Sequence, residues 1–158
     1  MNRDTSRLWC VLPAAAALIA FANTMPGDFV YDDVVLIERS QELKDFDLRR
    51  IFLQNYWGPE RTDRNYRPLT LLSYALNYRL SEKPGPFHAV NVVLNAAVAV
   101  LAYLVLLELL RDAAIAALGA TIFTVLPVHV EAVANIVGRA ELLAALAIFG
   151  AWFCALKS

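Results

Sequence analysis

Hydrophobic residues run through the chain in four long blocks that polar segments separate. Residues 8–27, 87–107, 113–130 and 142–156 contain no Asp, Glu, Lys or Arg. A helix of about 20 apolar residues is long enough to cross the hydrocarbon core of a membrane. The pattern therefore predicts four membrane-spanning helices over these ranges, and the last and shortest is expected to extend outward by a turn. No alternating pattern of the kind that predicts a strand is present.

The composition supports this interpretation. Of the 158 residues, 59% are hydrophobic and 18% are charged, whereas charged residues make up about 25% of soluble domains. We predict an all-α membrane protein, a multi-pass helical bundle whose main surroundings are membrane lipid. The net charge of -1 offers no basic face, which excludes nucleic-acid binding. Cys10 and Cys154 both lie in apolar blocks, so they indicate neither a disulfide framework nor a metal site.

The first block has two interpretations. Arg3 and Arg7 precede an Ala-rich run, as in a cleaved signal peptide. However, the run is longer than the h-region of about 7 to 15 residues that such peptides have, and "ANTMPGD" is a poor cleavage site. A retained membrane anchor is therefore favoured.

The basic residues predict how the chain is oriented. With four spans, Arg3, Arg7, Arg111 and Lys157 all fall on one side of the membrane, and basic residues near spans mark the cytoplasmic side. The long loop 28–86 and the short segment 127–140 then share the lumenal or extracytoplasmic side. This predicts an integral protein of the inner membrane in a bacterium, or of the endoplasmic reticulum membrane in a eukaryote.

The long outer loop opens with two adjacent carboxylates, Asp32 and Asp33. Such a pair near a bilayer surface can raise one another's pKa, bind a cation or act as a general base. A solvated turn is the simpler alternative.

Later in the loop, "RPLTLLSYALNYRL" predicts an amphipathic helix on the membrane interface. Pro68 suits the first helical position, and Leu69, Leu72 and Leu76 alternate with Thr70, Tyr74 and Asn77. Arg67 precedes this helix, where outward-pointing N–H groups and a guanidinium together suit a phosphate. Alternatively, Arg67 extends toward lipid headgroups.

Polar residues also interrupt the spans near the predicted outer side. His88, Asn91 and Asn95 recur at i, i+3 and i+7 and predict one helical stripe. Glu131, Asn135 and Arg139 recur at i+4 and predict a shared face with a hydrogen-bonded chain, for which a structural brace is the alternative. Topology brings the candidate site residues to one outer surface: Asp32, Asp33, Arg67, His88, Asn91, His129, Glu131 and Arg139.

Five motifs carry a resemblance to a known family: "YDD", "NYWG", "YRPLT", "FHAVN" and "PVHVEAVANIVGRAELL". In this order and spacing, from about Asp28 to about Phe149, the chain resembles the N-terminal part of the transmembrane and tetratricopeptide-repeat O-mannosyltransferases. That family is related to the protein O-mannosyltransferases of the GT-C class. The resemblance implies a GT-C-like N-terminal part with interfacial helices in its outer loop, and it implies that Asp32 or Asp33 is the catalytic base.

The resemblance also implies the chemistry. A sugar, which the family resemblance indicates is mannose, is expected to move from a polyprenyl-phosphate donor to a hydroxyl of a protein or glycan acceptor. Arg67, with Arg139 or His88, is expected to stabilise the phosphate, while Glu131 orients its neighbours. No metal is expected, because arginine can offset a monophosphate charge, and no cofactor is expected beyond the lipid-linked donor.

The chain departs from the family pattern in two ways. The family often has histidine at the positions of Asn95 and Leu126, so roles of those histidines do not carry over. The chain also has four predicted spans and no repeats, which indicates a fragment that is inactive alone. A component of a multi-pass transporter or flippase is the main rival interpretation, because intramembrane His, Glu and Arg also mark transport pathways. A structural membrane subunit is the third.

Overall fold

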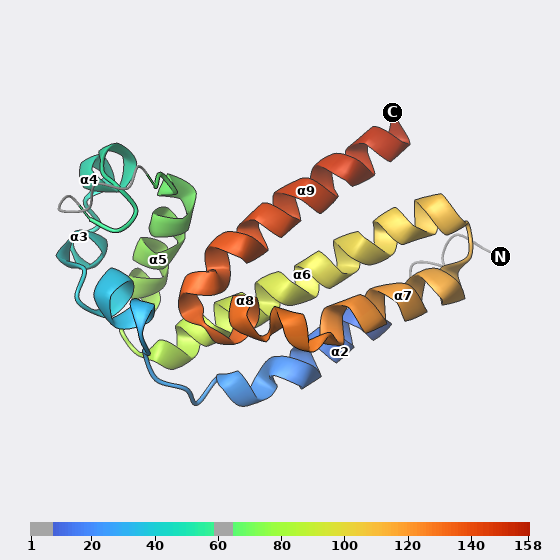
Figure 1. Ribbon diagram of the computed structural model, residues 1–158, viewed down its shortest axis with the longest axis horizontal. Helices are drawn as coiled ribbons and strands as arrows, with labels where there is room; N and C mark the ends of the chain where they lie inside the picture. The colour runs from blue at the N-terminus through green and yellow to red at the C-terminus, as the bar shows by residue number, and fades with distance from the viewer. Residues whose placement is uncertain (1–7, 59–64) are drawn as a thin grey trace.

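The computed structural model describes residues 8–58 and 65–158, and within these ranges every regular element is a helix (Figure 1). The predicted all-α class is confirmed. Arg3 and Arg7, which entered the prediction of orientation, lie outside the described residues.

The long helices form a bundle around α6 (Pro84–Leu110), which packs against α2 (Val11–Phe21), α7 (Ala113–Val125) and α9 (Arg139–Lys157). The long helices alternate in direction along the chain, in the order α2, α6, α7 and α9, and the outer loop lies at one end of the bundle (Figure 1). We call this the loop end. The opposite end, where residues 111–112 join α6 to α7, is the hairpin end.

Among the described residues, two helical stretches, Pro84–Leu110 and Ile136–Lys157, are long and apolar enough to cross a membrane. The spans predicted at 87–107 and 142–156 are thus present as helices, each longer than predicted. Pro84 and Pro86 lie in the first turn of α6, where a missing N–H costs no hydrogen bond.

The other two predicted spans are not continuous α-helices. The stretch 113–130 bends by 51° between Ala113–Val125 and Pro127–Ala134. The cause is Pro127, which keeps the preceding Leu126 in an extended conformation. The first block forms the shorter apolar stretch Val11–Thr24, in which α2 gives way to the 3₁₀ turn η1 (Ala22–Thr24).

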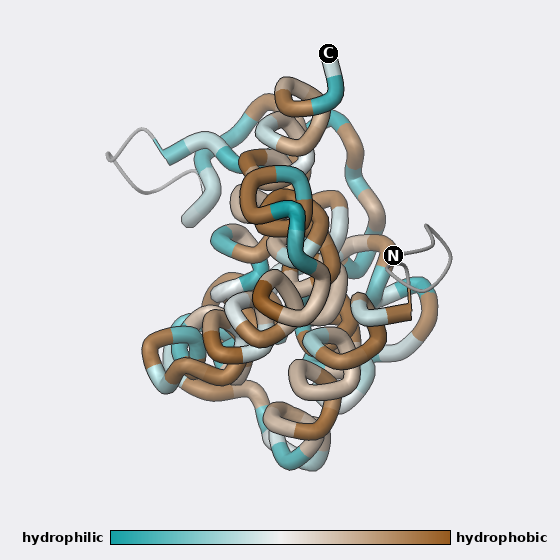
Figure 2. Tube along the Cα trace, turned by 90° about the vertical axis from the view of Figure 1, so that its right-hand side faces the viewer, coloured by the Kyte–Doolittle hydropathy of each residue, from teal (hydrophilic) through white to brown (hydrophobic). Residues whose placement is uncertain are grey.

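Small residues allow the bundle helices to pack closely. Ala102 and Tyr103 of α6 form a buried cluster with Ala116, Ala117 and Ala120 of α7, as small side chains do between membrane helices. Viewed from the hairpin end, much of the tube through the bundle is brown, with teal stretches between the hydrophobic coils (Figure 2).

At the hairpin end, polar side chains fix the helix ends. Asp112 caps α7 by accepting hydrogen bonds from the N–H groups of Ala114 and Ile115, at 2.9 and 3.0 Å. The carboxylate of Glu108 pairs with Lys157 at the end of α9. This ion pair joins α6 to α9 far from the loop.

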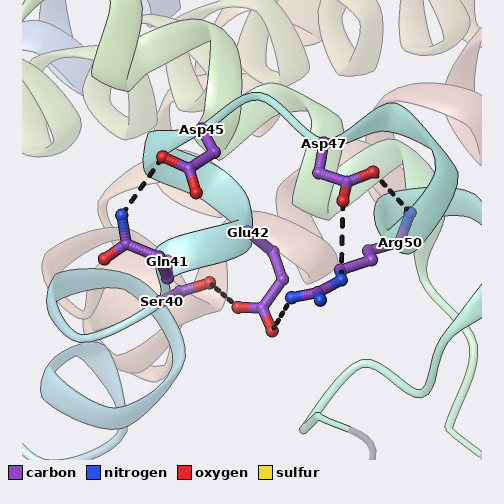
Figure 3. A network of polar contacts seen from close by, with 6 residues as sticks. All are labelled: Ser40, Gln41, Glu42, Asp45, Asp47 and Arg50. Atoms are coloured by element: carbon purple, nitrogen blue, oxygen red, sulfur yellow. Dashed lines mark hydrogen bonds and ion pairs between the residues drawn. The ribbon is translucent and has the colours of Figure 1, made fainter.

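The outer loop folds into short helices at the loop end: η2 (Val34–Glu38), α3 (Gln41–Lys44), α4 (Leu48–Leu53) and α5 (Pro68–Leu80). They share a core with the bundle, made of Leu36, Ile37, Leu43, Ile51, Tyr56, Leu71, Tyr74, Ala75, Tyr78, Phe87, Ile136 and Val137. On the surface, Glu42 accepts a hydrogen bond from Ser40 and pairs with Arg50 at 3.6 Å, and Asp47 caps α4 (Figure 3). Exposed ion pairs of this kind each contribute at most about 1 kcal/mol to the stability of the fold. The position of the loop is therefore determined mainly by the shared hydrophobic core.

Helix α5 has the predicted bounds, but its polar side faces inward. Thr70, Tyr74 and Asn77 are buried, whereas Leu69 and Leu76 are 69% and 51% exposed. A polar side that packs against the bundle needs hydrogen-bond partners there. The exposed leucines give the surface that lipid would cover at a membrane interface, and that location stays a prediction.

Candidate functional site

The loop end contains a break between α8 (Val130–Ala134) and α9, at which the chain passes through an extended Asn135 and the 3₁₀ turn η4 (Ile136–Gly138). The prediction that Glu131, Asn135 and Arg139 share one helical face is therefore wrong. Glu131 is exposed and Arg139 is fully buried. No ion pair between them forms in the described structure, because the break turns the two side chains apart.

Side chains from three distant segments satisfy the backbone groups of this break. Oδ1 of Asp33 accepts a hydrogen bond from the N–H of Val137 at 2.9 Å. The hydroxyl of Tyr74 on α5 and the amide of Asn91 on α6 both donate to the carbonyl of Ile136, at 3.2 Å each. Buried backbone groups need such partners, so the break is stable only where these side chains meet.

Arg139 joins three helices at the same place. Its Nε donates to Oδ1 of Asn91 at 2.9 Å, and Nη2 donates to Oδ1 of Asn77 and the carbonyl of Phe87, both at 3.0 Å. Nη1 donates to the carbonyl of Ser73 at 3.2 Å. Every nitrogen of the guanidinium is thus directed at a protein acceptor. The geometry supports a structural role for Arg139 in place of the expected contact with phosphate.

The two adjacent aspartates lie in different environments. Asp33 is fully buried, its Oδ2 also accepts a long hydrogen bond of 3.4 Å from the N–H of Val30, and burial raises the pKa of its carboxyl. Asp32 is exposed. A carboxylate that must meet a substrate needs access, so the geometry separates an accessible Asp32 from a tethering Asp33.

His88, Asn91 and Asn95 are all buried on α6, as expected for one stripe. Gly27 packs against His88 so closely that a Cβ at this glycine would lie 3.0 Å from Nε2 of the imidazole. His88 therefore lies beside the start of the outer loop, and none of the three residues lines the cleft described below.

His129, another candidate site residue, is also away from that cleft. It lies in the bend after α7, half-buried, with its ring edge-to-face with Phe123 at a centroid distance of 4.7 Å. In this structure the imidazole packs inside the helix bend.

A small polar cleft of about 130 Å³ lies at the loop end. It is lined by Asp32, Tyr56, Trp57, Arg67, Glu131, Asn135, Val137, Gly138 and Glu141. Of the candidate site residues, the cleft brings together Asp32, Arg67 and Glu131, which are far apart in the sequence. Its wall of residues 131–141 is the break that Asp33 and Arg139 hold in place.

Besides Asn135, Val137 and Gly138 of the break, three further residues of the cleft were not among the candidates. Glu141 follows Arg139 in the motif "GRAELL", while Tyr56 and Trp57 come from "NYWG". Tyr56 is buried, which raises the pKa of its phenol, and the guanidinium of Arg67 lies 5.1 Å from the centroid of its ring. The motifs were the available signal, but nothing in their spacing indicated which side chains would face a common cleft.

A larger, mostly apolar groove of about 480 Å³ continues from the polar cleft, and the two share Arg67 and Glu141. The groove runs between the start of α5 and α9, where Ala140, Ala144 and Ala147 leave space beside the helix. Within the described ranges, no group of three or more His, Cys, Asp or Glu side chains could hold a metal ion.

Comparisons with known proteins agree with the resemblance of the motifs. Over 142 residues, 86% of this chain, it is 39% identical to the mouse protein named Protein O-mannosyl-transferase TMTC3 (Mus musculus). It is 39% identical over 143 residues to mouse Protein O-mannosyl-transferase TMTC1, and 36% identical over 154 residues to the human TMTC4 protein (Homo sapiens), covering 85% and 84% of this chain.

The chain spans 15% of the length of the TMTC3 and TMTC1 relatives and 20% of the TMTC4 relative. No family model and no solved structure matches it. The aligned region includes most of the loop and bundle described above. By this similarity, the chain belongs, as a segment, to the TMTC family of protein O-mannosyl-transferases.

Proposed function

We propose that this chain supplies part of the active site of a membrane mannosyltransferase. The enzyme moves mannose from a polyprenyl-phosphate donor to a hydroxyl group of a protein, on the lumenal or extracytoplasmic side of a bacterial inner membrane or the endoplasmic reticulum membrane. The observation that carries the proposal is the polar cleft, which an accessible carboxylate and a guanidinium both line at the loop end of a bundle of apolar helices. The names of the relatives supply the sugar and the acceptor class.

Asp32 is the general base in this proposal. It is exposed and lines the cleft, so an acceptor hydroxyl can reach its carboxylate. Asp33 is less suited, because its oxygens already accept backbone hydrogen bonds from Val137 and Val30 and its side chain has no exposed surface. A base needs direct access to the proton that it removes.

Arg67 is the group that stabilises the donor phosphate. It is exposed at the start of α5, and it faces both the polar cleft and the apolar groove. A polyprenyl phosphate has a charged head and an apolar chain, and these two adjoining surfaces match the two parts. A charge-assisted contact from a guanidinium to phosphate is about twice as strong as a neutral hydrogen bond.

The transfer then proceeds as one in-line displacement. The acceptor oxygen attacks C1 of the sugar while Asp32 accepts the hydroxyl proton. The bond between C1 and the phosphate oxygen breaks, and its electron pair leaves with the lipid phosphate, whose charge Arg67 offsets. Configuration at C1 inverts, and no oxidant or reductant takes part.

The test uses the full-length protein in membranes with radiolabelled polyprenyl-phosphate mannose and a protein acceptor. We expect labelled protein and free polyprenyl phosphate to form in equal amounts. Arg67→Gln should lower kcat/KM for the donor by about 10- to 100-fold, since a hydrogen bond to a charged group contributes about 1.5 to 3 kcal/mol. Arg79→Gln is the control, because Arg79 is exposed near the end of α5, away from the cleft. If intact donor instead crosses the membrane without being consumed, the rival interpretation of the chain as part of a transporter or flippase would be favoured.

A further inference from the structure

The motif "NYWG" builds a rigid turn beside the polar cleft. The N–H of Gly58 donates to the carbonyl of Asn55, and the N–H of Trp57 donates to Oδ1 of Asn55, both at 3.0 Å. Gly58 has a φ of 96°, which glycine adopts without strain. An Asn side chain that accepts a backbone N–H two residues on is a common way to fix a turn, and here it fixes the position of Trp57.

Tyr56 anchors the turn on its buried side. It is 2% exposed, its N–H donates to the carbonyl of Asn65 at 2.7 Å, and the guanidinium of Arg67 lies over its ring. The ring of Trp57 meets that of Tyr56 edge-to-face, with centroids 5.1 Å apart and planes at 76°. Trp57 itself is half-buried and lines the cleft, so a large aromatic ring is held in a fixed orientation at the cleft wall.

The other side chains of the cleft are suited to hydroxyl groups. Asp32, Glu131 and Glu141 supply carboxylate acceptors. Asn135 also lines the cleft, and its Oδ1 is buried without a hydrogen-bond partner among the described residues. A buried acceptor of this kind is costly unless a partner satisfies it, and a ligand hydroxyl in the cleft would do so.

We propose that Trp57 forms the platform on which the transferred sugar lies, and that it determines recognition of the sugar part of the donor. The inference rests on the proposed function. A hexose presents hydroxyls at its edge and C–H groups on its face, and the negative π face of an indole attracts those C–H groups. The cleft, at about 130 Å³, is smaller than the roughly 300 Å³ at which drug-sized pockets begin. This size suits a single monosaccharide unit better than a larger glycan.

The experiment compares the sugar-loaded donor with its sugar-free form in the full-length protein. Trp57→Ala should raise the KM for polyprenyl-phosphate mannose about three- to tenfold, the scale of an aromatic contact of about 0.5 to 1.5 kcal/mol. The inhibition constant of sugar-free polyprenyl phosphate should stay unchanged. Trp57→Phe, which keeps a ring and guards against misfolding, should recover most of the affinity. Trp152→Ala is the control, because Trp152 is exposed on α9 and stacks on Phe149 away from the cleft.

An unchanged KM in Trp57→Ala would overturn the platform, and so would an equal rise in the KM and in the inhibition constant. Either result, in a protein whose parent form transfers mannose, rejects the platform and leaves the proposed function standing. A parent protein that transfers no mannose from the lipid donor rejects both.

Discussion

Individual buried polar side chains organise the loop end. Asp33 and Arg139 are both fully buried, yet they form no ion pair with each other. Each instead binds neutral groups: Asp33 accepts from backbone N–H groups, and Arg139 donates to carbonyl and amide oxygens such as Oδ1 of Asn91. Burial of a charge is tolerated only with such partners. The conformation of the cleft wall therefore depends on a few specific hydrogen bonds.

Replacement of Arg139 should show this dependence. Arg139→Met fills similar space but leaves acceptors on Asn91, Asn77 and Phe87 without a donor. A buried acceptor left without its donor costs about 1 to 3 kcal/mol, so we expect the free energy of unfolding to fall by at least that amount. The measurement is denaturant unfolding in detergent.

The matched control is Arg79→Met. Arg79 is exposed and contacts the ring of Phe46 at 5.6 Å, and surface substitutions usually change stability by less than about 0.5 kcal/mol. Equal losses in the two variants would show that Arg139 does not organise the loop end.

At the level of the elements, the break between α8 and α9 determines the shape of the polar cleft. Its tightest point is Gly138, where an added Cβ would lie 2.4 Å from the carbonyl oxygen of Ala132. That neighbour is backbone and cannot move away as a flexible side chain does. Glycine is therefore required here for close approach, although its φ of -61° is ordinary.

Two glycine substitutions test this requirement. Gly138→Ala should lower the melting temperature of the protein, because the backbone of Ala132 must shift. Gly150→Ala should raise it slightly, since nothing lies within 4 Å of a Cβ at that position and alanine is favoured over glycine in a helix by about 1 kcal/mol. Melting curves that shift alike for both variants would contradict the tight contact at Gly138.

The sequence predicted the helices better than the breaks within and between them. Helix α5 and the two longest bundle helices follow from apolar blocks and from proline at helix starts. The i+4 spacing of Glu131, Asn135 and Arg139 predicted one continuous helix, but the chain is interrupted at Asn135. The break depends on Asp33, Tyr74 and Asn91, which come from distant parts of the chain, and local periodicity contains no information about such partners.

At the scale of the whole molecule, a small polar cleft lies at the loop end of an apolar bundle. Sequence patterns alone brought the candidate site residues to a common end, and the structure selects among them: Asp32, Arg67 and Glu131 face the cleft. Asp33, His88, Asn91 and Arg139 are buried and do not line it. Which polar residue is exposed and which is buried was not predictable, because exposure depends on how the loop packs on α6 and α9.

The division of roles between Asp32 and Asp33 is tested most directly by the turnover rate of two variants of the full-length protein. General-base catalysis contributes about 10²- to 10⁴-fold, so Asp32→Asn should lower mannose transfer by about that factor. Asp33→Asn should keep the rate within about tenfold of the parent, because its amide oxygen can still accept the hydrogen bond from the N–H of Val137. A larger loss in Asp33→Asn than in Asp32→Asn, or parental rates in both variants, would contradict the assignment of Asp32 as the base.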